Sequence, residues 1–503
     1  MPLQNAPICD LTVTAFNDPT RLFHKSPPPY PTDPIDFIIP VSYFFLVKPI
    51  WNMTMAGNNV IAFRNPASPI AHFIRIGEAH KKFGELYAAG RLPIRRVVIE
   101  ASRLLFQRDF IADLRRDGVE IVLDTQVAEL SAKARFAGAV RHAPWAVAGE
   151  LLGPQHFAAN ASTDIIGQIA RFAVAHNIDT VLAPTHFLAD PDHPDWLSID
   201  RASCLALRAA LDREGGKHIA IDYPVIHSHV AINDGSQRSE VVGALNDLPF
   251  DNLWLRLSGL GHEAKPQTTR QFLLSLQGIH NLGCPIIIDH LDGLLGQAAL
   301  AFGAASGLAH GIMERNQFDA RSWHKEPEPR DEESGFGKTT YIPIPGLAKS
   351  LKRNELEYLS NARGGKRALG CQDVCCSHGV TNMVSDTRQH AARQAFAAVE
   401  VFTPVPDHNR EQFFLEKPLR ETERIARTIK DLRPNAKDAA RFGIDEKGAA
   451  SLTKRLTDHH GRVVKLGDTL TLMHETRGKG APRAKTASGP RISGHSDNIQ
   501  QMR

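Results

Sequence analysis

The stretch "RRVVIEASRLLFQRDFIADLRRDGVEIVLDT", residues 95–125, contains one complete strand–helix–strand unit. Its two ends are short β-branched apolar runs, and the "RDFIADLRRDG" between them has helical periodicity. Neither run alternates strictly between apolar and polar residues, which is typical of strands covered on both faces in a parallel sheet. The stretch therefore predicts a β/α fold.

Comparable apolar runs recur along the chain, and helical patterns separate most of them. They begin at residues 60 ("VIAF"), 96, 119, 179, 218, 253, 285 and 306. Eight strands alternating with helices predict a (β/α)8 TIM barrel, although a doubly wound open sheet would give a similar pattern. We expect the barrel to occupy residues 51–325.

The flanking segments do not show this alternation of strands and helices. Residues 1–50 form a Pro-rich extension, and residues 326–435 contain a charged loop, a cysteine cluster and two long helical patterns. We interpret 326–435 as an appended zinc-binding helical subdomain, and 436–503 as a helical and basic, partly disordered tail.

Composition restricts the class of protein. The chain has 503 residues with 59 Lys+Arg against 55 Asp+Glu, so charge alone does not indicate a nucleic-acid partner. Six cysteines without an export signal favour a reducing, cytoplasmic location. The apolar run at 37–47 is shorter than a bilayer span, so no membrane association is expected.

The cysteine cluster "GCQDVCCSHG", residues 370–379, predicts a metal site. A structural zinc ion takes four thiolate or imidazole ligands, for which Cys371, Cys375, Cys376 and the later His390 are the candidates. His378 competes for the histidine position, and one of the two adjacent cysteines is a candidate bystander. The alternative is a set of buried, unliganded cysteines.

In a TIM barrel the active site lies at the carboxyl ends of the strands. The polar residues and glycines that follow the apolar runs are Arg64, Asn65, Glu100, Asp124, His186, Asp222, Gly259 to Gly261, Asp289, His290, His310 and Glu314. Asp222 and His290 are expected to bind substrate. Helix capping and loop hydrogen bonds are the alternative role for many of these side chains. "HSH" at 227–229 would instead suit a metal-dependent hydrolase.

The order of these features resembles the tRNA-guanine transglycosylase family. The order "FDARSW" at 318, "TYIPIPG" at 340 and "CQDVCC" at 371 is similar to that of the archaeal branch of this family. The resemblance implies a TIM barrel with a zinc subdomain, and an enzyme that exchanges guanine in nucleic acid for a 7-deazaguanine base.

The resemblance also implies residue roles. Asp319 would be the nucleophile that attacks the ribose C1′, and Asp124 would be the general acid/base. Gly259, Leu260 and Gly261 would read the base, and the four metal ligands above would hold a structural Zn²⁺. In the family two glycines and a phenylalanine follow the acid/base aspartate, whereas Thr125 and Gln126 follow Asp124 here, so the chain would be a diverged member.

The expected partners are therefore tRNA or DNA and a small purine-like base. A TIM-barrel metal-dependent hydrolase and a non-catalytic nucleic-acid-binding or defence component are the alternatives. The oligomeric state is open, with a homodimer among the options.

Overall fold

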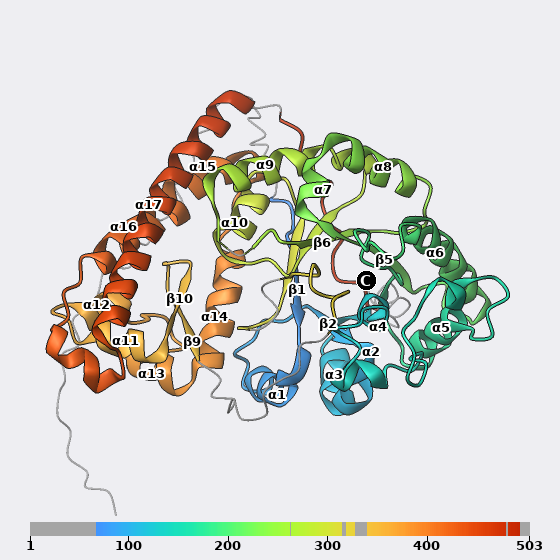
Figure 1. Ribbon diagram of the computed structural model, residues 1–503, viewed down its shortest axis with the longest axis horizontal. Coiled ribbons are helices and arrows are strands. Elements are labelled where there is room, and N and C mark those ends of the chain that lie inside the picture. Colours follow the sequence, from blue (N-terminus) through green and yellow to red (C-terminus); the bar gives the residue numbers. More distant parts are fainter. Residues whose placement is uncertain (1–66, 262, 314–317, 327–339, 479–480, 493–503) are drawn as a thin grey trace, which may run out of the picture. The chain divides into compact units, whose positions relative to one another are not determined.

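The computed structural model describes residues 67–261, 263–313, 318–326, 340–478 and 481–492 (Figure 1). Within this part of the chain, eight parallel strands close into a barrel in sequence order. The strands are β1 (Ala71–Arg75), β2 (Arg96–Glu100), β3 (Glu120–Asp124), β4 (Thr180–Leu182), β5 (Ala220–Ser228), β6 (Leu253–Ser258), β7 (Ile286–Asp289) and β8 (Gly307–His310). The predicted (β/α)8 barrel is confirmed.

Helices surround the barrel and continue into the C-terminal part. Those before residue 302 are α1 (His80–Ala88), α2 (Ala101–Leu104), α3 (Arg108–Arg116), α4 (Val127–Leu130), α5 (Ile165–Ala175), α6 (Trp196–Arg213), α7 (His229–Asn233), α8 (Gly235–Leu245), α9 (Pro266–Gln277) and α10 (Gly293–Ala301). A hairpin of β9 (Tyr341–Ile344) and β10 (Lys349–Lys352) then precedes α11 (Arg353–Ser360), α12 (Gly365–Leu369), α13 (Val380–Ser385), α14 (Thr387–Glu400), α15 (Arg410–Phe414), α16 (Arg420–Lys430) and α17 (Glu446–Arg477). None of the helices among the described residues is long and apolar enough to cross a bilayer.

The first barrel strand is not the predicted one. "VIAF" at 60–63 lies outside the described residues, and the barrel is completed by β1, which pairs with both β2 and β8. The sequence of β1, "AHFIR", was missed because His72 and Arg75 break its apolar pattern. Phe73 faces the barrel interior, where its ring lies 4.7 Å from that of Trp254.

Side chains fill the barrel in layers. Its middle is apolar and contains Phe73, Val98, Val122, Leu182, Trp254, Ile287 and Ala309. Charged and polar groups lie on either side of this layer: Arg96, Glu120, Thr180 and Asp222 toward the amino ends of the strands, and Arg75, Asp124, Arg256 and Asp289 toward the carboxyl ends. The barrel is therefore a packed core with an ionic layer at each end.

Asp222 lies at the amino end of the barrel, so its predicted role in substrate binding is wrong. It is the third residue of β5, a nine-residue strand that runs on to Ser228. Its carboxylate accepts hydrogen bonds from Asn252 Nδ2, Trp254 Nε1 and Arg491 Nη1. The aspartate in the middle of the apolar run was mistaken for the end of the strand.

Residues 481–492, expected to belong to a partly disordered tail, instead close the amino end of the barrel. Ala487 packs in the interior apolar cluster. The backbone N–H of Arg491 donates to Glu120 Oε2 at 3.0 Å, and the carbonyl of Lys485 accepts from Ser306 Oγ at 2.5 Å.

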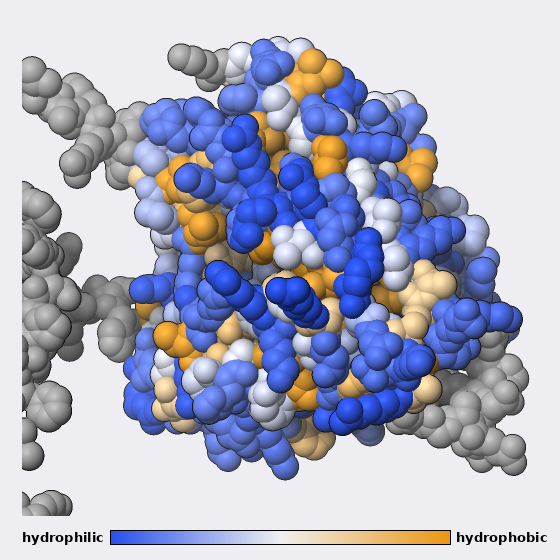
Figure 2. All heavy atoms as spheres, turned by 90° about the vertical axis from the view of Figure 1, so that its left-hand side faces the viewer, coloured by the Kyte–Doolittle hydropathy of each residue, from blue (hydrophilic) through white to orange (hydrophobic). Residues whose placement is uncertain are grey.

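The appended subdomain has a core of its own. Ile342, Leu356, Leu369, Met383 and Ile429 belong to this core. Helix α17 joins it to the barrel, because its first half contributes to the subdomain core while its second half, including residues 463–473, contributes to the barrel core (Figure 1). The subdomain core therefore extends past the predicted boundary at 435. The face seen in Figure 2 is hydrophilic over most of its area, with small separate apolar patches.

Candidate functional site

Four buried charges form the floor of the barrel mouth. Arg75 Nη1 lies 2.7 Å from Asp124 Oδ2, and Arg256 Nη2 lies 2.8 Å from the same oxygen. Both guanidiniums also contact Asp289, with Arg256 Nε at 2.7 Å and Arg75 Nε at 2.8 Å. These four residues are called the ionic floor below. They join the last residues of β1, β3 and β7 to the fourth residue of β6.

The ionic floor keeps its carboxylates ionised. Burial acts to raise the pKa of Asp124, but the charges of Arg256 and Arg75 outweigh it and lower the pKa below its usual range. The pKa of Asp289 is likewise lowered, because Arg75, His290 and Arg256 outweigh burial. Asp124 does lie at the mouth as predicted, yet its oxygen Oδ2 is occupied by two guanidiniums.

Asp319 also lies at the mouth, in the segment 318–326 that follows β8. Its Oδ1 accepts hydrogen bonds from Ser258 Oγ at 2.9 Å and from Arg321 Nε at 2.8 Å, and Oδ2 pairs with Arg321 Nη2. The side chain is 46% exposed. Hydrogen bonding to Arg321 holds the pKa of Asp319 well below its usual range. The mouth therefore presents an oriented, accessible carboxylate.

An apolar wall joins the Asp319 segment to the barrel. Its buried members are Ala128, Ala132, Phe187, Ile226, Ala320 and Trp323, with Phe318 packed against them. His290 follows β7 at the same end, and its ring lies 5.3 Å from that of Phe318. His290 is therefore placed at the mouth, as predicted.

The predicted glycine pair lies beside Asp319. Gly259 and Gly261 have φ angles of 78° and 75°, which favour glycine. A Cβ at Gly259 would approach His229 Nδ1 to 3.3 Å and Arg321 Cζ to 3.4 Å. Leu260 between them is buried.

Other predicted residues do not face the mouth. His186 is buried against α6, where its Nδ1 lies 2.6 Å from Asp200 Oδ1 and its ring stacks on Trp196 at 3.6 Å. His227 alternates with Ile226 along β5 and so points away from the mouth, and burial lowers its pKa to about 4. His229, the second histidine of "HSH", has its Nδ1 3.3 Å from the Ser258 carbonyl. Arg64, Asn65 and Glu314 lie outside the described residues.

Glu129 was missed in the sequence. It lies on α4, five residues after Asp124, and its Oε2 is buried without a hydrogen-bond partner among the described residues. Burial raises its pKa, and the charge of Asp124 raises it further. The signal available in the sequence was a glutamate five residues after Asp124, the aspartate that ends β3.

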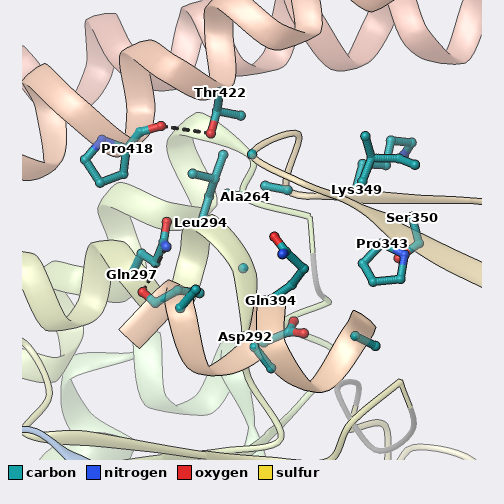
Figure 3. Close-up of a pocket in the computed structure, with 18 of the residues that line it drawn as sticks. Ala264, Asp292, Leu294, Gln297, Pro343, Lys349, Ser350, Gln394, Pro418 and Thr422 are labelled. Atoms are coloured by element: carbon teal, nitrogen blue, oxygen red, sulfur yellow. Dashed lines mark hydrogen bonds between the residues drawn. The ribbon is translucent and has the colours of Figure 1, made fainter. Parts of the chain in front are cut away.

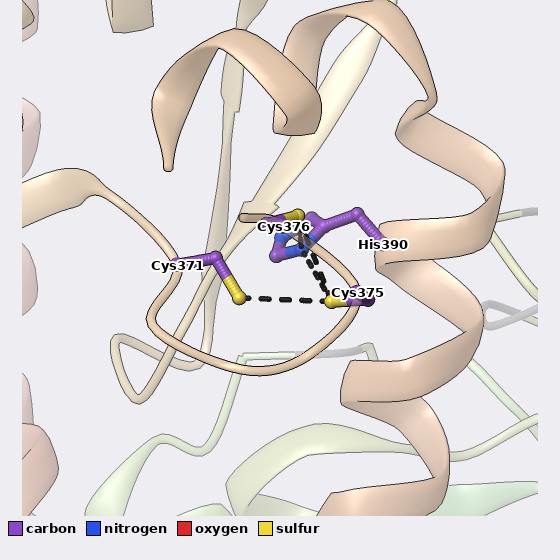
Figure 4. Close-up of side chains that lie close together, drawn as sticks. All are labelled: Cys371, Cys375, Cys376 and His390. Atoms are coloured by element: carbon purple, nitrogen blue, oxygen red, sulfur yellow. Dashed lines mark hydrogen bonds between the residues drawn. The ribbon is translucent and has the colours of Figure 1, made fainter. Parts of the chain in front are cut away.

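Three cysteines and a histidine gather in the subdomain. Cys371, Cys375 and Cys376 lie in the loop between α12 and α13, and His390 reaches them from α14 (Figure 4). One ligand atom from each lies within 4.8 Å of all the others. His378, the competing histidine, is exposed and its backbone N–H donates to Asn382. This Cys3His cluster can hold a metal ion, and both adjacent cysteines belong to it.

The spacing within the Cys3His cluster fits a tetrahedral ion. The Sγ–Sγ distances are 3.7 Å for Cys371–Cys375 and 3.6 Å for Cys375–Cys376, and His390 Nδ1 lies 3.4 Å from Cys376 Sγ. A tetrahedral zinc ion places two sulfur ligands about 3.8 Å apart, and a sulfur and a nitrogen about 3.5 Å apart. His390 Nε2 lies 2.8 Å from the Pro343 carbonyl, to which it can only donate, so Nδ1 keeps its lone pair for a metal.

A cleft of about 2090 Å³ separates the barrel from the subdomain. Leu294 and Gln297 of α10 line one side, and Gln394 of α14 with Pro343 and Lys349 of the hairpin line the other (Figure 3). The loops after β6, β7 and β8 also contribute to it, so the cleft lies beside the carboxyl end of the barrel. His310 lines this cleft, with its Nε2 3.0 Å from His72 Nε2.

Comparison with known proteins identifies no family. No family model matches the chain, and no curated protein matches its sequence. Among solved structures, an endo-1,4-beta-xylanase from Penicillium canescens is 10% identical over 47% of this chain and 81% of its own, with a TM-score of 0.32. KGPDC from Streptococcus mutans is 13% identical over 52% of this chain and 95% of its own, with a TM-score of 0.29. Similarities this low support no conclusion about function.

Proposed function

We propose that the protein is a base-exchanging pentosyltransferase that replaces guanine in tRNA or DNA with a 7-deazaguanine base. The observation that carries the proposal is Asp319, an accessible carboxylate that Ser258 and Arg321 orient at the barrel mouth. Displacing a base from ribose or deoxyribose needs an anionic nucleophile near C1′. With its pKa lowered, Asp319 is ionised at neutral pH and meets this need.

The surroundings of Asp319 suit a nucleotide turned out of its stack. Phe318, which is only partly buried against the apolar wall, offers surface for a base, and Gly259 beside Asp319 is also only partly buried. Arg321 is largely exposed, so it can exchange its contact with Asp319 for a phosphate as the nucleotide enters.

The cleft supports a nucleic-acid partner. Its lining contains eight lysines and arginines against five carboxylates. The basic residues are Lys82, Lys349, Arg388, Lys417, Arg420, Arg424, Arg455 and Arg462. A net positive lining beside the mouth would attract a phosphate backbone toward Asp319.

Zinc is the metal that we propose for the Cys3His cluster. Three thiolates and one imidazole at tetrahedral spacing form a closed structural site, since no position is left for substrate. The ion would tie the cysteine loop to α14, and through His390 to Pro343 of the hairpin. Its role is to hold the subdomain that lines the cleft.

The test is a covalent adduct. The full-length protein is incubated with guanine-containing tRNA or duplex DNA, and denaturing gels are used to detect a protein–nucleic acid species. We expect a heat-stable adduct that Asp319→Asn abolishes and that a 7-deazaguanine base resolves to exchanged product.

Asp247→Asn is the matched control, because this exposed aspartate also pairs with an arginine, Arg201, at 2.9 Å, but lies outside the mouth. It should retain the adduct. An adduct that persists in Asp319→Asn, or its absence from the wild type with both nucleic acids, would refute the proposed function.

A further inference from the structure

Base exchange needs a proton donor as well as a nucleophile, and the ionic floor leaves Asp124 poorly suited to that role. Its Oδ2 lies 2.7 Å from Arg75 Nη1 and 2.8 Å from Arg256 Nη2, and Oδ1 accepts the backbone N–H of Gln126 at 3.1 Å. A carboxylate held by two guanidiniums favours its ionised form. It has no proton to give and is a weak base.

Glu129 lies on α4, directly after β3 at the same end of the barrel, and the charges of Asp124 and Arg256 act on it. Its neighbour Ala128 belongs to the same buried cluster as Ile226 and Ala320, and Ala320 is the residue next to Asp319. Helix α4 and the Asp319 segment therefore share the apolar wall of the mouth. Within the described residues, Glu129 Oε2 is buried without a hydrogen-bond partner. A buried polar atom of this kind needs a partner, which a bound substrate can supply.

The charges around Glu129 favour its neutral form. Burial is the main cause that raises its pKa, and the negative charge of Asp124 adds to it. Arg256 and Arg135 oppose this effect without overcoming it. Glu129 thus favours its protonated form, whereas Asp319 favours its ionised form. Two carboxyl groups whose pKa values differ in this way typically act as a general acid and a nucleophile.

We infer that Glu129, rather than Asp124, protonates the departing base and takes up the proton of the entering base. This inference rests on the proposed function. In the first step an oxygen of Asp319 bonds to C1′, the C1′–N9 bond breaks, and its electron pair on the base accepts the proton of Glu129. In the second step the Glu129 carboxylate removes N9–H from the entering base, N9 bonds to C1′, and the bond from C1′ to Asp319 breaks. Protons and charges balance over the cycle.

The inference is tested with two leaving bases. Guanine needs a proton to depart as a neutral molecule, whereas 7-methylguanine already carries the positive charge and departs neutral without one. We expect Glu129→Gln to slow adduct formation on a guanine oligonucleotide by about 10²- to 10⁴-fold, the usual contribution of a general acid. With a single 7-methylguanine at the same position, its rate should stay within a few-fold of wild type.

A pH profile gives a second readout. In the wild type, the rate on guanine should fall as the pH rises through the pKa of Glu129, because the acid form is lost. Glu129→Gln should lack that limb. Asp124, Arg256 and Arg135 are the charged groups that influence this pKa, and none of them is changed. Glu150→Gln, an exposed glutamate in the same connection between β3 and β4, should behave as wild type on both bases.

The negative results distinguish a failure of this inference from a failure of the proposed function. If Glu129→Gln reacts like wild type with guanine, or loses activity equally on guanine and 7-methylguanine, the inference is wrong while the transglycosylase proposal stands. If the adduct survives Asp319→Asn or never forms in the wild type, the proposed function fails and the inference fails with it.

Discussion

Replacing Arg491 with alanine should destabilise the barrel from its amino end. Arg491 Nη1 lies 3.1 Å from Asp222 Oδ1 and 3.0 Å from Thr180 Oγ1, and 3.8 Å from Glu120 Oε1. Its side chain is 21% exposed, whereas that of Asp222 is fully buried and that of Glu120 nearly so. The substitution removes the cation from two buried carboxylates in the barrel interior.

The expected magnitude follows from this geometry. Removing one partner of a buried ion pair costs 3–5 kcal/mol, because the remaining charge is uncompensated. Arg96 stays 3.2 Å from Glu120 and still neutralises part of that charge. Partial exposure of Arg491 also reduces the effect, so we expect a loss of about 3 kcal/mol in the free energy of unfolding at neutral pH.

The loss should depend on pH. Burial raises the pKa of Asp222, and Arg491 opposes that rise; burial likewise raises the pKa of Glu120, against Arg96 and Arg491. Without Arg491 both folded-state pKa values increase further above their unfolded-state values. A group of this kind favours folding at low pH and loses that contribution as the pH rises through its folded-state pKa. The difference between variant and wild type should therefore be largest at neutral pH and should shrink in acid.

Urea unfolding of wild type and Arg491→Ala at neutral and mildly acidic pH measures this difference. Arg116→Ala is the control, because Arg116 is exposed and pairs with Asp113 only on the surface, so it should change stability by less than about 0.5 kcal/mol. A loss below about 1 kcal/mol at neutral pH, or one that does not shrink in acid, would show that residues 481–492 do not neutralise the barrel interior.

Two further outcomes are expected. Cys371→Ser should reduce bound zinc, measured by metal analysis, from one equivalent per chain to near zero, because the Cys3His cluster loses a ligand. The melting temperature should also fall. Retention of a full equivalent of zinc would exclude Cys371 from the site. Asp289→Asn should lower the free energy of unfolding, measured in urea, by about 3–5 kcal/mol, because Arg75 and Arg256 lose one of their two buried carboxylates. A loss under about 1 kcal/mol would show that the ionic floor does not stabilise the fold.

Local patterns in the sequence predicted the elements that depend on neighbouring residues. Seven of the eight barrel strands coincide with predicted runs that are mainly apolar, and these runs are visible because both faces of each strand are buried. The metal ligands lie within 20 residues of one another, so spacing alone brought Cys371, Cys375, Cys376 and His390 together as candidates. The position of Gly259 followed from the rule that barrel sites lie where strands end, whereas Asp319 became a candidate through the family resemblance.

The tertiary structure decided what depends on distant partners. Arg75 in β1 is stable inside the barrel because Asp124 and Asp289 neutralise it, and no local pattern reveals partners 49 and 214 residues away. The same holds for Asp222, whose arginine partner comes from residue 491. Burial and the charges that folding brings together decide which carboxyl group is ionised and which is protonated. Neither can be predicted from the residue type alone.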